Sequence, residues 1–138
     1  MHQSTRQITL ETRGKGLLEF TGAVEEFVAG AGVETGVLTV FCRHTSASLL
    51  IQENADPDVQ TDLKQFFEAI APEGGAYIHR AEGPDDMPAH IRAALTQSQL
   101  SIPIMDRRMV LGTWQGIYLF EHRRAPHRRS VVLHAIGE

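Results

Sequence analysis

The alternation of apolar and polar residues divides the chain into segments typical of strands and of helices. Residues 4–11 alternate between the two kinds, which predicts a strand with one face in water. Residues 37–44 carry apolar side chains on both faces, so we expect a strand in the centre of a sheet or against a partner chain. Further strands are expected at residues 17–20, 48–52, 100–104, 114–122 and 130–135.

Helical spacing of apolar residues occurs in three places. Thr21 is the expected cap of a first helix, and Asp56 followed by Pro57 is the expected start of a second. A shorter helix is predicted from about Pro88 to Thr96, after a loop rich in Gly, Pro and Asp. Strands outnumber helices and do not alternate regularly with them, so the sequence predicts an α+β fold with a largely antiparallel sheet.

Length and composition are those of an ordinary globular domain. The chain has 138 residues, of which 42% are hydrophobic and 22% charged, so we expect a single domain over residues 1–138. No apolar run approaches the ~20 residues of a membrane span, and the N-terminus lacks the apolar stretch of a secretory signal. With one cysteine, Cys42, no intrachain disulfide forms. We therefore expect a cytoplasmic protein without a membrane partner.

Charge is distributed unevenly along the chain. The formal net charge is −4, but residues 1–106 hold 7 Lys and Arg against 15 Asp and Glu, while residues 107–138 hold 6 Arg against 2 Glu. Arginine presents a planar fork that suits carboxylates and phosphates. The basic end is either an anion-binding surface or a set of solvated and internally paired side chains.

Three histidines lie in polar surroundings rich in turns: His44, His79 and His90. A trio of imidazoles can bind a divalent metal. Their spacings, 35 and 11 residues, match no short metal motif, and most histidines in proteins are not ligands. Metal binding and an ordinary structural role therefore both remain open for them.

Acidic and amide side chains gather at two expected helix starts. Glu53, Asn54 and Asp56 lie before the second helix, and Asp86 lies before the third. Oxygen ligands of this kind suit Mg²⁺. Asp56 and Asp86 are equally well explained as helix caps, whereas Glu53 and Asn54 have no such simple explanation.

The segment 112–117 combines glycines with Gln115, and Glu121 follows on the same face of the expected strand. A glutamate that faces a core needs a cationic partner, which the nearby arginines can supply. Trp114 is expected in the core, and Cys42 is expected to be buried and inert. Nucleophilic catalysis has little support, because Ser46 lies in no nucleophile-elbow motif.

Four motifs follow one another along the chain: His44–Leu49, Glu53–Pro57, Glu82–Ile91 and Gly112–Ile117, the last followed by Glu121 and Arg123. In this order they resemble the YjbQ family, also called uncharacterised protein family 0047 or secondary thiamine-phosphate synthase. The resemblance covers nearly the whole chain.

The resemblance implies a compact α+β fold rich in antiparallel strands, a homotrimer, and a weak thiamine-phosphate synthase activity. That reaction joins hydroxymethylpyrimidine diphosphate to thiazole phosphate and releases pyrophosphate. The resemblance also raises the expectation that the three histidines share a pocket at a subunit boundary. The chain departs from the family at Arg124–His127, where many members have a turn containing glycine.

Together these observations give an expected site and three candidate functions. The functions are a thiamine-phosphate synthase, a metal-binding protein or metal-dependent hydrolase, and a non-catalytic trimer that binds anions. Nucleic acid is a poor partner for this acidic chain, in which aromatic residues do not alternate with basic ones. The cofactor is expected to be Zn²⁺ or Mg²⁺, and the substrate a small phosphorylated molecule. The expected catalytic residues are His44, Ser46, Glu53, Asn54, Asp86, Gln115 and Glu121; the phosphate-binding residues are Thr45, Gly112, Thr113, Arg128 and Arg129; the metal ligands are His44, His79 and His90.

Overall fold

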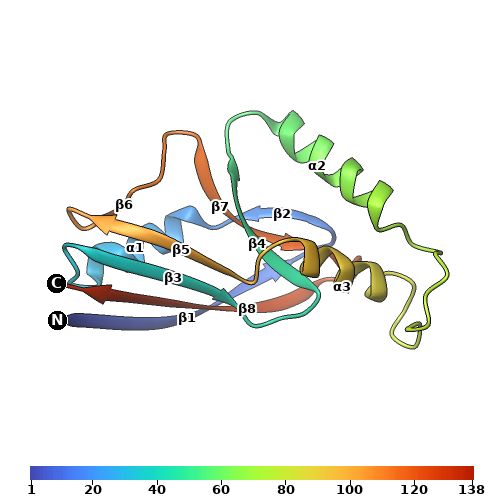
Figure 1. Cartoon of the computed structure of the whole chain (residues 1–138), viewed down its shortest axis with the longest axis horizontal. Helices are drawn as coiled ribbons and strands as arrows, with labels where there is room; N and C mark the ends of the chain where they lie inside the picture. The colour runs from blue at the N-terminus through green and yellow to red at the C-terminus, as the bar shows by residue number, and fades with distance from the viewer.

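The computed structural model describes residues 1–138 and folds them into two antiparallel sheets and three helices (Figure 1). The strands are β1 (His2–Thr12), β2 (Gly16–Glu19), β3 (Gly36–Cys42), β4 (Ala47–Glu53), β5 (Gln99–Met105), β6 (Arg108–Met109), β7 (Gln115–Glu121) and β8 (His127–Gly137). The helices are α1 (Thr21–Gly30), α2 (Pro57–Ile70) and α3 (Asp86–Leu95).

The larger sheet has the order β1-β8-β3-β5-β6, and every pairing in it is antiparallel. Leu38 in the central strand β3 pairs with Ala135 on one side and with Ile102 on the other, and all three are buried. Helix α1 covers this inner face through Val24 and Phe27 (Figure 1). The period-two pattern of the sequence thus places one row of each strand in the core.

The smaller sheet has the order β2-β7-β4, and its central strand β7 is buried on both faces. Ile117 and Leu119 of β7 belong to the same 19-residue core cluster as α1 and the larger sheet. Phe120 points to the opposite face and packs edge-on against Phe67 of α2, with ring centroids 5.2 Å apart. Because both faces of β7 are buried, its residues read as a continuous apolar run.

The α+β class, the antiparallel sheets and the expected helices are confirmed, but the expected helix caps are only partly right. Asp56 caps α2 by accepting a hydrogen bond from the Asp58 amide at 2.9 Å. Thr21 is the first residue inside α1, and its hydroxyl instead donates to Glu19. The prediction for Asp86 is also wrong, because Asp85 occupies the cap position of α3 and Asp86 lies in its first turn.

The prediction of a core position for Trp114 is wrong as well. The indole is 62% exposed, because the residue lies in the loop before β7 rather than in the strand. Cys42 is buried and free, as expected. No helix is long and apolar enough to cross a membrane.

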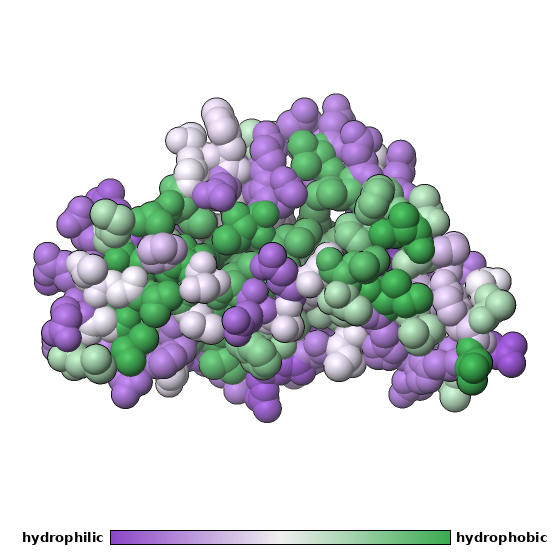
Figure 2. Space-filling view, in the orientation of Figure 1, coloured by the Kyte–Doolittle hydropathy of each residue, from purple (hydrophilic) through white to green (hydrophobic).

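The outer face of the larger sheet has no helix over it. Val37 and Phe41 of β3 lie there beside Val132 and Ile136 of β8, and all four are only half-buried or exposed. Figure 2 shows green, hydrophobic surface over β3 and β5. Strand β3 is therefore central in the sheet, but one of its two apolar faces is not covered within the chain.

Candidate metal centre and neighbouring polar groups

Two histidines and two carboxylates meet where the loop before α3 folds back on the first turns of that helix. Asp86 and His90 are four residues apart on α3, and therefore share one helix face. His79 and Glu82 come from the preceding loop, and one ligand atom of each of the four lies within 4.8 Å of the others. The Nε2 atoms of His79 and His90 lie 2.7 and 2.9 Å from the same Asp86 oxygen, Oδ2. Nε2 of His79 is also 3.4 Å from Oε2 of Glu82.

His90 faces an acceptor with each of its ring nitrogens. Nδ1 lies 2.8 Å from the backbone oxygen of Thr45, and Nε2 faces the Asp86 carboxylate. A neutral imidazole has one N–H and one lone pair, so either neutral tautomer would leave a nitrogen lone pair against an oxygen. A proton or a metal ion at Nε2 removes this conflict, while the bond from Nδ1–H to a backbone carbonyl is the usual support of a metal-bound histidine.

Arg123 holds the Asp86 carboxylate from the opposite side. Its Nη1 donates to Oδ1 of Asp86 at 2.8 Å, and its Nε donates to Asp85 at 3.0 Å. The Asp86 side chain is only 3% exposed, whereas that of Glu82 is 66% exposed. The cluster therefore has a fixed, buried side made by Asp86 and Arg123, and an open side made by Glu82 and His79.

The electrostatics of the cluster favour a cation. The hydrogen bond to Asp86 raises the pKa of His79, and the negative charges of Asp86 and Glu82 act in the same direction. Burial alone would raise the pKa of Asp86, but the hydrogen bond from His79 and nearby positive charges bring it below its usual range. Asp85 behaves similarly: burial opposes its ionisation, yet Arg123 lowers its pKa to about 2. Asp85 and Asp86 therefore stay ionised at neutral pH, and their negative charge favours a cation beside them.

His44 does not join the other two histidines. It follows the end of β3, and its Nε2 accepts a hydrogen bond from the backbone amide of Ser130 at 2.7 Å. Burial, followed by the charge of Arg129, lowers the pKa of His44. The structure thus brings together His79 and His90, whose ring centroids are 5.5 Å apart, and places His44 in a different set of contacts.

Glu121 and Arg129 form a second polar group, which is closed to solvent. Nε of Arg129 donates to Oε1 of Glu121 at 2.8 Å, and Nη2 bonds the hydroxyl of Ser46 at 3.0 Å. Thr12 also donates to Glu121, and the residues are 1% (Glu121) and 4% (Arg129) exposed. Burial opposes ionisation, but Arg129 and Thr12 bring the pKa of Glu121 below its usual value. In this structure the donors of Arg129 and Thr12 are engaged inside the protein by Glu121 and Ser46.

The remaining expected phosphate ligands lie elsewhere. Arg128 is exposed and faces Glu11 across the β1–β8 pair, with Nε and Oε1 3.7 Å apart. Thr45 contributes its backbone oxygen to His90. Glu53 supports the start of α2, because its Oε2 accepts from the amides of Ala55 and Asp56 at 3.0 and 2.9 Å.

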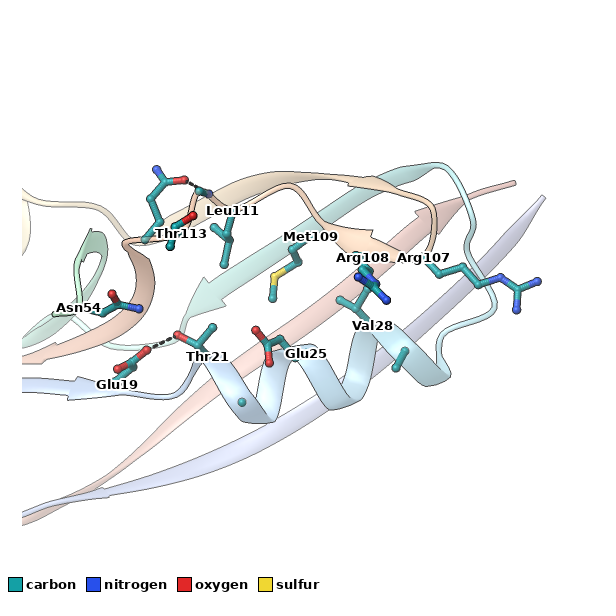
Figure 3. Close-up of a pocket in the computed structure, with 14 residues that line it drawn as sticks. Glu19, Thr21, Glu25, Val28, Asn54, Arg107, Arg108, Met109, Leu111 and Thr113 are labelled. Atoms are coloured by element: carbon teal, nitrogen blue, oxygen red, sulfur yellow. Dashed lines mark hydrogen bonds between the residues drawn. The ribbon is translucent and has the colours of Figure 1, made fainter.

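Four expected site residues line a separate cleft beside α1: Asn54, Gly112, Thr113 and Gln115 (Figure 3). The Gly112 amide, an expected anion donor, already donates to Oε1 of Gln115 at 2.7 Å. Its prediction as a free phosphate-binding amide therefore has no support in this geometry.

Sequence reasoning assigned no site role to Glu82 or to Arg123. The spacing of Asp86 and His90 on one helix face was the signal available for the cluster, since residues four apart lie together on a helix. Nothing in the sequence showed that the loop would bring His79 and Glu82 to that face.

The fold and the cluster define a class of protein: an α+β domain of two antiparallel sheets with an N₂O₂ histidine–carboxylate group at one end. The family model described as "UPF0047 protein YjbQ-like" matches residues 6–138. The chain therefore belongs to the YjbQ-like UPF0047 family, as its motifs predicted.

Individual relatives agree with this membership. The UPF0047 protein sll1880 of Synechocystis is 55% identical over 132 residues, which cover 95% of this chain and 90% of the relative. The UPF0047 protein YjbQ of Salmonella typhimurium is 40% identical over 134 residues, or 96% and 97% of the two chains. A crystal structure of a YjbQ/UPF0047 family protein from Clostridium acetobutylicum superposes with a TM-score of 0.89 at 38% identity, covering 95% and 99% of the chains. None of these names states an activity, so the function of this chain is argued from its own residues.

Proposed function

We propose that this protein binds a divalent metal ion through His79, Asp86, His90 and Glu82, and that the metal serves a reaction of a small phosphorylated molecule. The main support for the metal site is that two imidazole Nε2 atoms converge on one carboxylate oxygen. Ligands at about 2.0–2.2 Å from a tetrahedral zinc ion lie roughly 3.3–3.6 Å from one another. Three nitrogen–oxygen pairs of the cluster are 2.7, 2.9 and 3.4 Å apart and all four ligand atoms lie within 4.8 Å of one another, so the ion requires only local shifts of these side chains.

The donor set favours zinc over magnesium. Imidazole suits Zn²⁺ and related transition metals, whereas Mg²⁺ is held mainly by oxygen ligands and water. The buried side of the cluster supplies the supporting contacts that a metal site requires, from the Thr45 carbonyl to His90 and from Arg123 to Asp86. The exposed side, at Glu82 and His79, leaves room for water or substrate to reach the ion.

A shallow depression borders the open side of the cluster. Tyr77, Ile78 and Met87 give it apolar walls, and Arg80, which forms no ion pair, lies on its rim. A substrate with a ring and a phosphate matches this combination, because the ring packs on the apolar walls and the phosphate pairs with the arginine. Thiamine-phosphate synthesis is a reaction of such substrates, and we propose it as the first activity to assay.

In that reaction the bond between the pyrimidine methylene carbon and the diphosphate oxygen breaks, and pyrophosphate leaves with the electron pair. A bond then forms between the methylene carbon and the thiazole nitrogen, so atoms and charge balance. His79, Asp86, His90 and Glu82 would hold a divalent metal that would supply electrostatic stabilisation of the negative charge on pyrophosphate. Arg80 would hold a phosphate, and Arg123 would keep Asp86 oriented toward the metal.

Metal analysis of untagged protein tests the proposal. We expect about one equivalent of metal per chain, and we expect His90→Gln to lower the affinity by more than the roughly 10–100-fold that loss of a supporting residue produces. His134→Gln, on β8, is the matched control and keeps full occupancy. Less than about a tenth of an equivalent, with no uptake on titration, would overturn the proposal.

The assay for thiamine phosphate is run on the same variants. Activity in the wild type that falls in His90→Gln in parallel with metal content would support the synthase. Equal activity in the two proteins, or no activity in fully metal-loaded wild type, would contradict the synthase proposal. Neither result would contradict the proposed metal site.

We also propose that the chain assembles as a homotrimer through the uncovered face of the larger sheet. Half-exposed apolar side chains on β3 and β8, among them Val37 and Val132, support an interface between copies there. Light scattering should give a mass three times that of the chain, and Phe41→Glu should shift it to the monomer. A monomeric wild type would contradict this assembly.

A further inference from the structure

A second cavity, of about 670 Å³, lies between α1 and the segment that leads from β6 into β7 (Figure 3). Helix α1 and helix α3 lie toward opposite ends of the long axis of the molecule (Figure 1), so this cleft is separate from the metal cluster. Its lining is bipolar. Carboxylates and amides gather at one end and two arginines at the other.

The acceptor end is built around Glu19. Thr21 donates from its hydroxyl to Oε2 of Glu19 at 2.8 Å and accepts from the Ile117 amide at the same distance. Glu19 is thereby fixed, while its second oxygen has no hydrogen-bond partner in the protein. A Cβ at Gly116 would lie 2.7 Å from Oε2 of Glu19 and 3.2 Å from Cβ of Asn54, so the glycine leaves room for the Glu19 carboxylate in its present position.

Glu25, on α1 one turn after Thr21, adds a second carboxylate. It makes no ion pair or hydrogen bond within the chain, and its carboxylate points from the helix toward the opposite wall (Figure 3). That wall is apolar, with Met109 and Leu111 packed on the core. A carboxylate facing an apolar wall favours a ligand that has both a cationic group and a hydrocarbon part.

The opposite end is basic. Arg107 comes from the turn between β5 and β6, Arg108 is the first residue of β6, and neither forms an ion pair. Asp106 and Arg107 both have positive φ angles, 51° and 65°, which non-glycine residues rarely adopt. This turn brings Arg108 over α1 near Val28 (Figure 3). At the end of the cleft opposite Glu19, a cationic side chain can therefore pair with an acidic group of a ligand.

We propose that this cleft binds a small bipolar ligand, with an amine or other N–H-bearing cation at Glu19 and Glu25 and a phosphate or carboxylate at Arg108. The amide oxygens of Asn54 and Gln115 add acceptors beside the cationic group. The site does not depend on the metal proposal, because it shares no residue with the metal cluster.

Four probes define the ligand: aminohexyl phosphate and aminohexanoate, which carry both charges, and hexylamine and inorganic phosphate, which carry one. Binding is followed in protein treated with a chelator, from the amide signals of Gly22 and Gly112 and the fluorescence of the only tryptophan, Trp114. We expect both bipolar probes to bind several-fold more tightly than either single-charge probe. The tighter of the two bipolar probes identifies phosphate or carboxylate as the acidic group.

Glu25→Gln and Glu26→Gln form a matched pair on exposed positions of α1, and only Glu25 lines the cleft. Loss of a charge-assisted hydrogen bond should weaken the amine-bearing probes roughly tenfold in Glu25→Gln. Glu26→Gln should leave their affinity unchanged. Equal affinities in the two variants, bipolar probes no tighter than single-charge probes, or no change in the cleft signals would each overturn the proposal.

Discussion

Two charged groups of this protein are built from short contacts between oppositely charged side chains, and they differ in what remains unsatisfied. Around Glu121 and Arg129, carboxylate oxygens meet N–H and O–H donors, and the group is buried. In the cluster of His79 and Asp86, two imidazole nitrogens contact one oxygen, His90 has an acceptor at each ring nitrogen, and one side is open to solvent.

This difference distinguishes a buried, paired group from a candidate ligand-binding group more clearly than residue type does. A buried ion pair with all its partners has no capacity left for a ligand, and breaking it is destabilising. A group whose ligand atoms converge on one point, and which needs a proton or a metal ion there, is a candidate functional site. Glu and Arg occur in both groups, so these residue types alone could not distinguish them.

The largest predicted effect follows from breaking the buried pair. Arg129→Met leaves the Glu121 carboxylate buried without its cation, and we expect the free energy of unfolding to fall by about 3–5 kcal/mol. Urea denaturation measures it. Arg128→Met, at the exposed neighbouring position, should change it by less than about 1 kcal/mol.

The double replacement Glu121→Leu with Arg129→Met sharpens this prediction. With both charges removed, much of the lost stability should return, because no uncompensated charge remains. A double variant as unstable as Arg129→Met would show that the pair acts through shape rather than charge.

A pH dependence is expected from His122, which is buried behind the pair. Burial, followed by the charges of Arg92 and Arg129, lowers its pKa from the usual 6.5 to about 3, although Glu121 acts in the opposite direction. Between these two pH values His122 binds a proton in the unfolded chain but not in the folded chain. The contribution of neutral His122 to the free energy of unfolding is therefore complete above pH 6.5 and is lost as the pH falls toward 3.

Urea denaturation between those pH values tests this expectation. The wild type should lose stability more steeply than His122→Gln, whose side chain does not titrate. Parallel curves for the two proteins would show that other groups carry the acid sensitivity.

A smaller effect is predicted for the support of the open cluster. Arg123→Gln leaves the metal ligands in place but frees Asp86, and we expect a roughly 10–100-fold loss of zinc affinity by titration calorimetry. Arg124→Gln, the adjacent arginine, which is 58% exposed, is the control. Equal affinities in the two variants would mean that Asp86 needs no orientation from Arg123.

Much of the fold could be predicted because burial imposes a period on strands. Leu38 and Val40 point to the core as the alternation indicates, and the Asp56–Pro57 start of α2 depends on neighbouring residues alone. The two-residue strand β6 was missed because so short a segment has no period to detect. The prediction of a core position for Trp114 was wrong because the apolar character of its ring does not show that the residue lies in a loop.

The candidate site was less predictable, because it depends on where loops go. His79 and His90 meet, but His44 turns to the Ser130 amide instead. Asp86 was expected to cap α3, but it lies in the first turn of the helix and its side chain faces His79 and His90. Sequence spacing cannot fix such long-range contacts, since they depend on the path of residues 73–85.

The most direct test of the metal centre is a crystal structure of untagged protein grown with zinc, with anomalous data collected on both sides of the zinc edge. We predict an anomalous peak about 2.0–2.2 Å from Nε2 of His79, Nε2 of His90 and Oδ2 of Asp86, with Glu82 or a water completing the coordination. No peak there at full zinc loading, with both imidazoles still bonded directly to the Asp86 carboxylate, would contradict the proposed metal site.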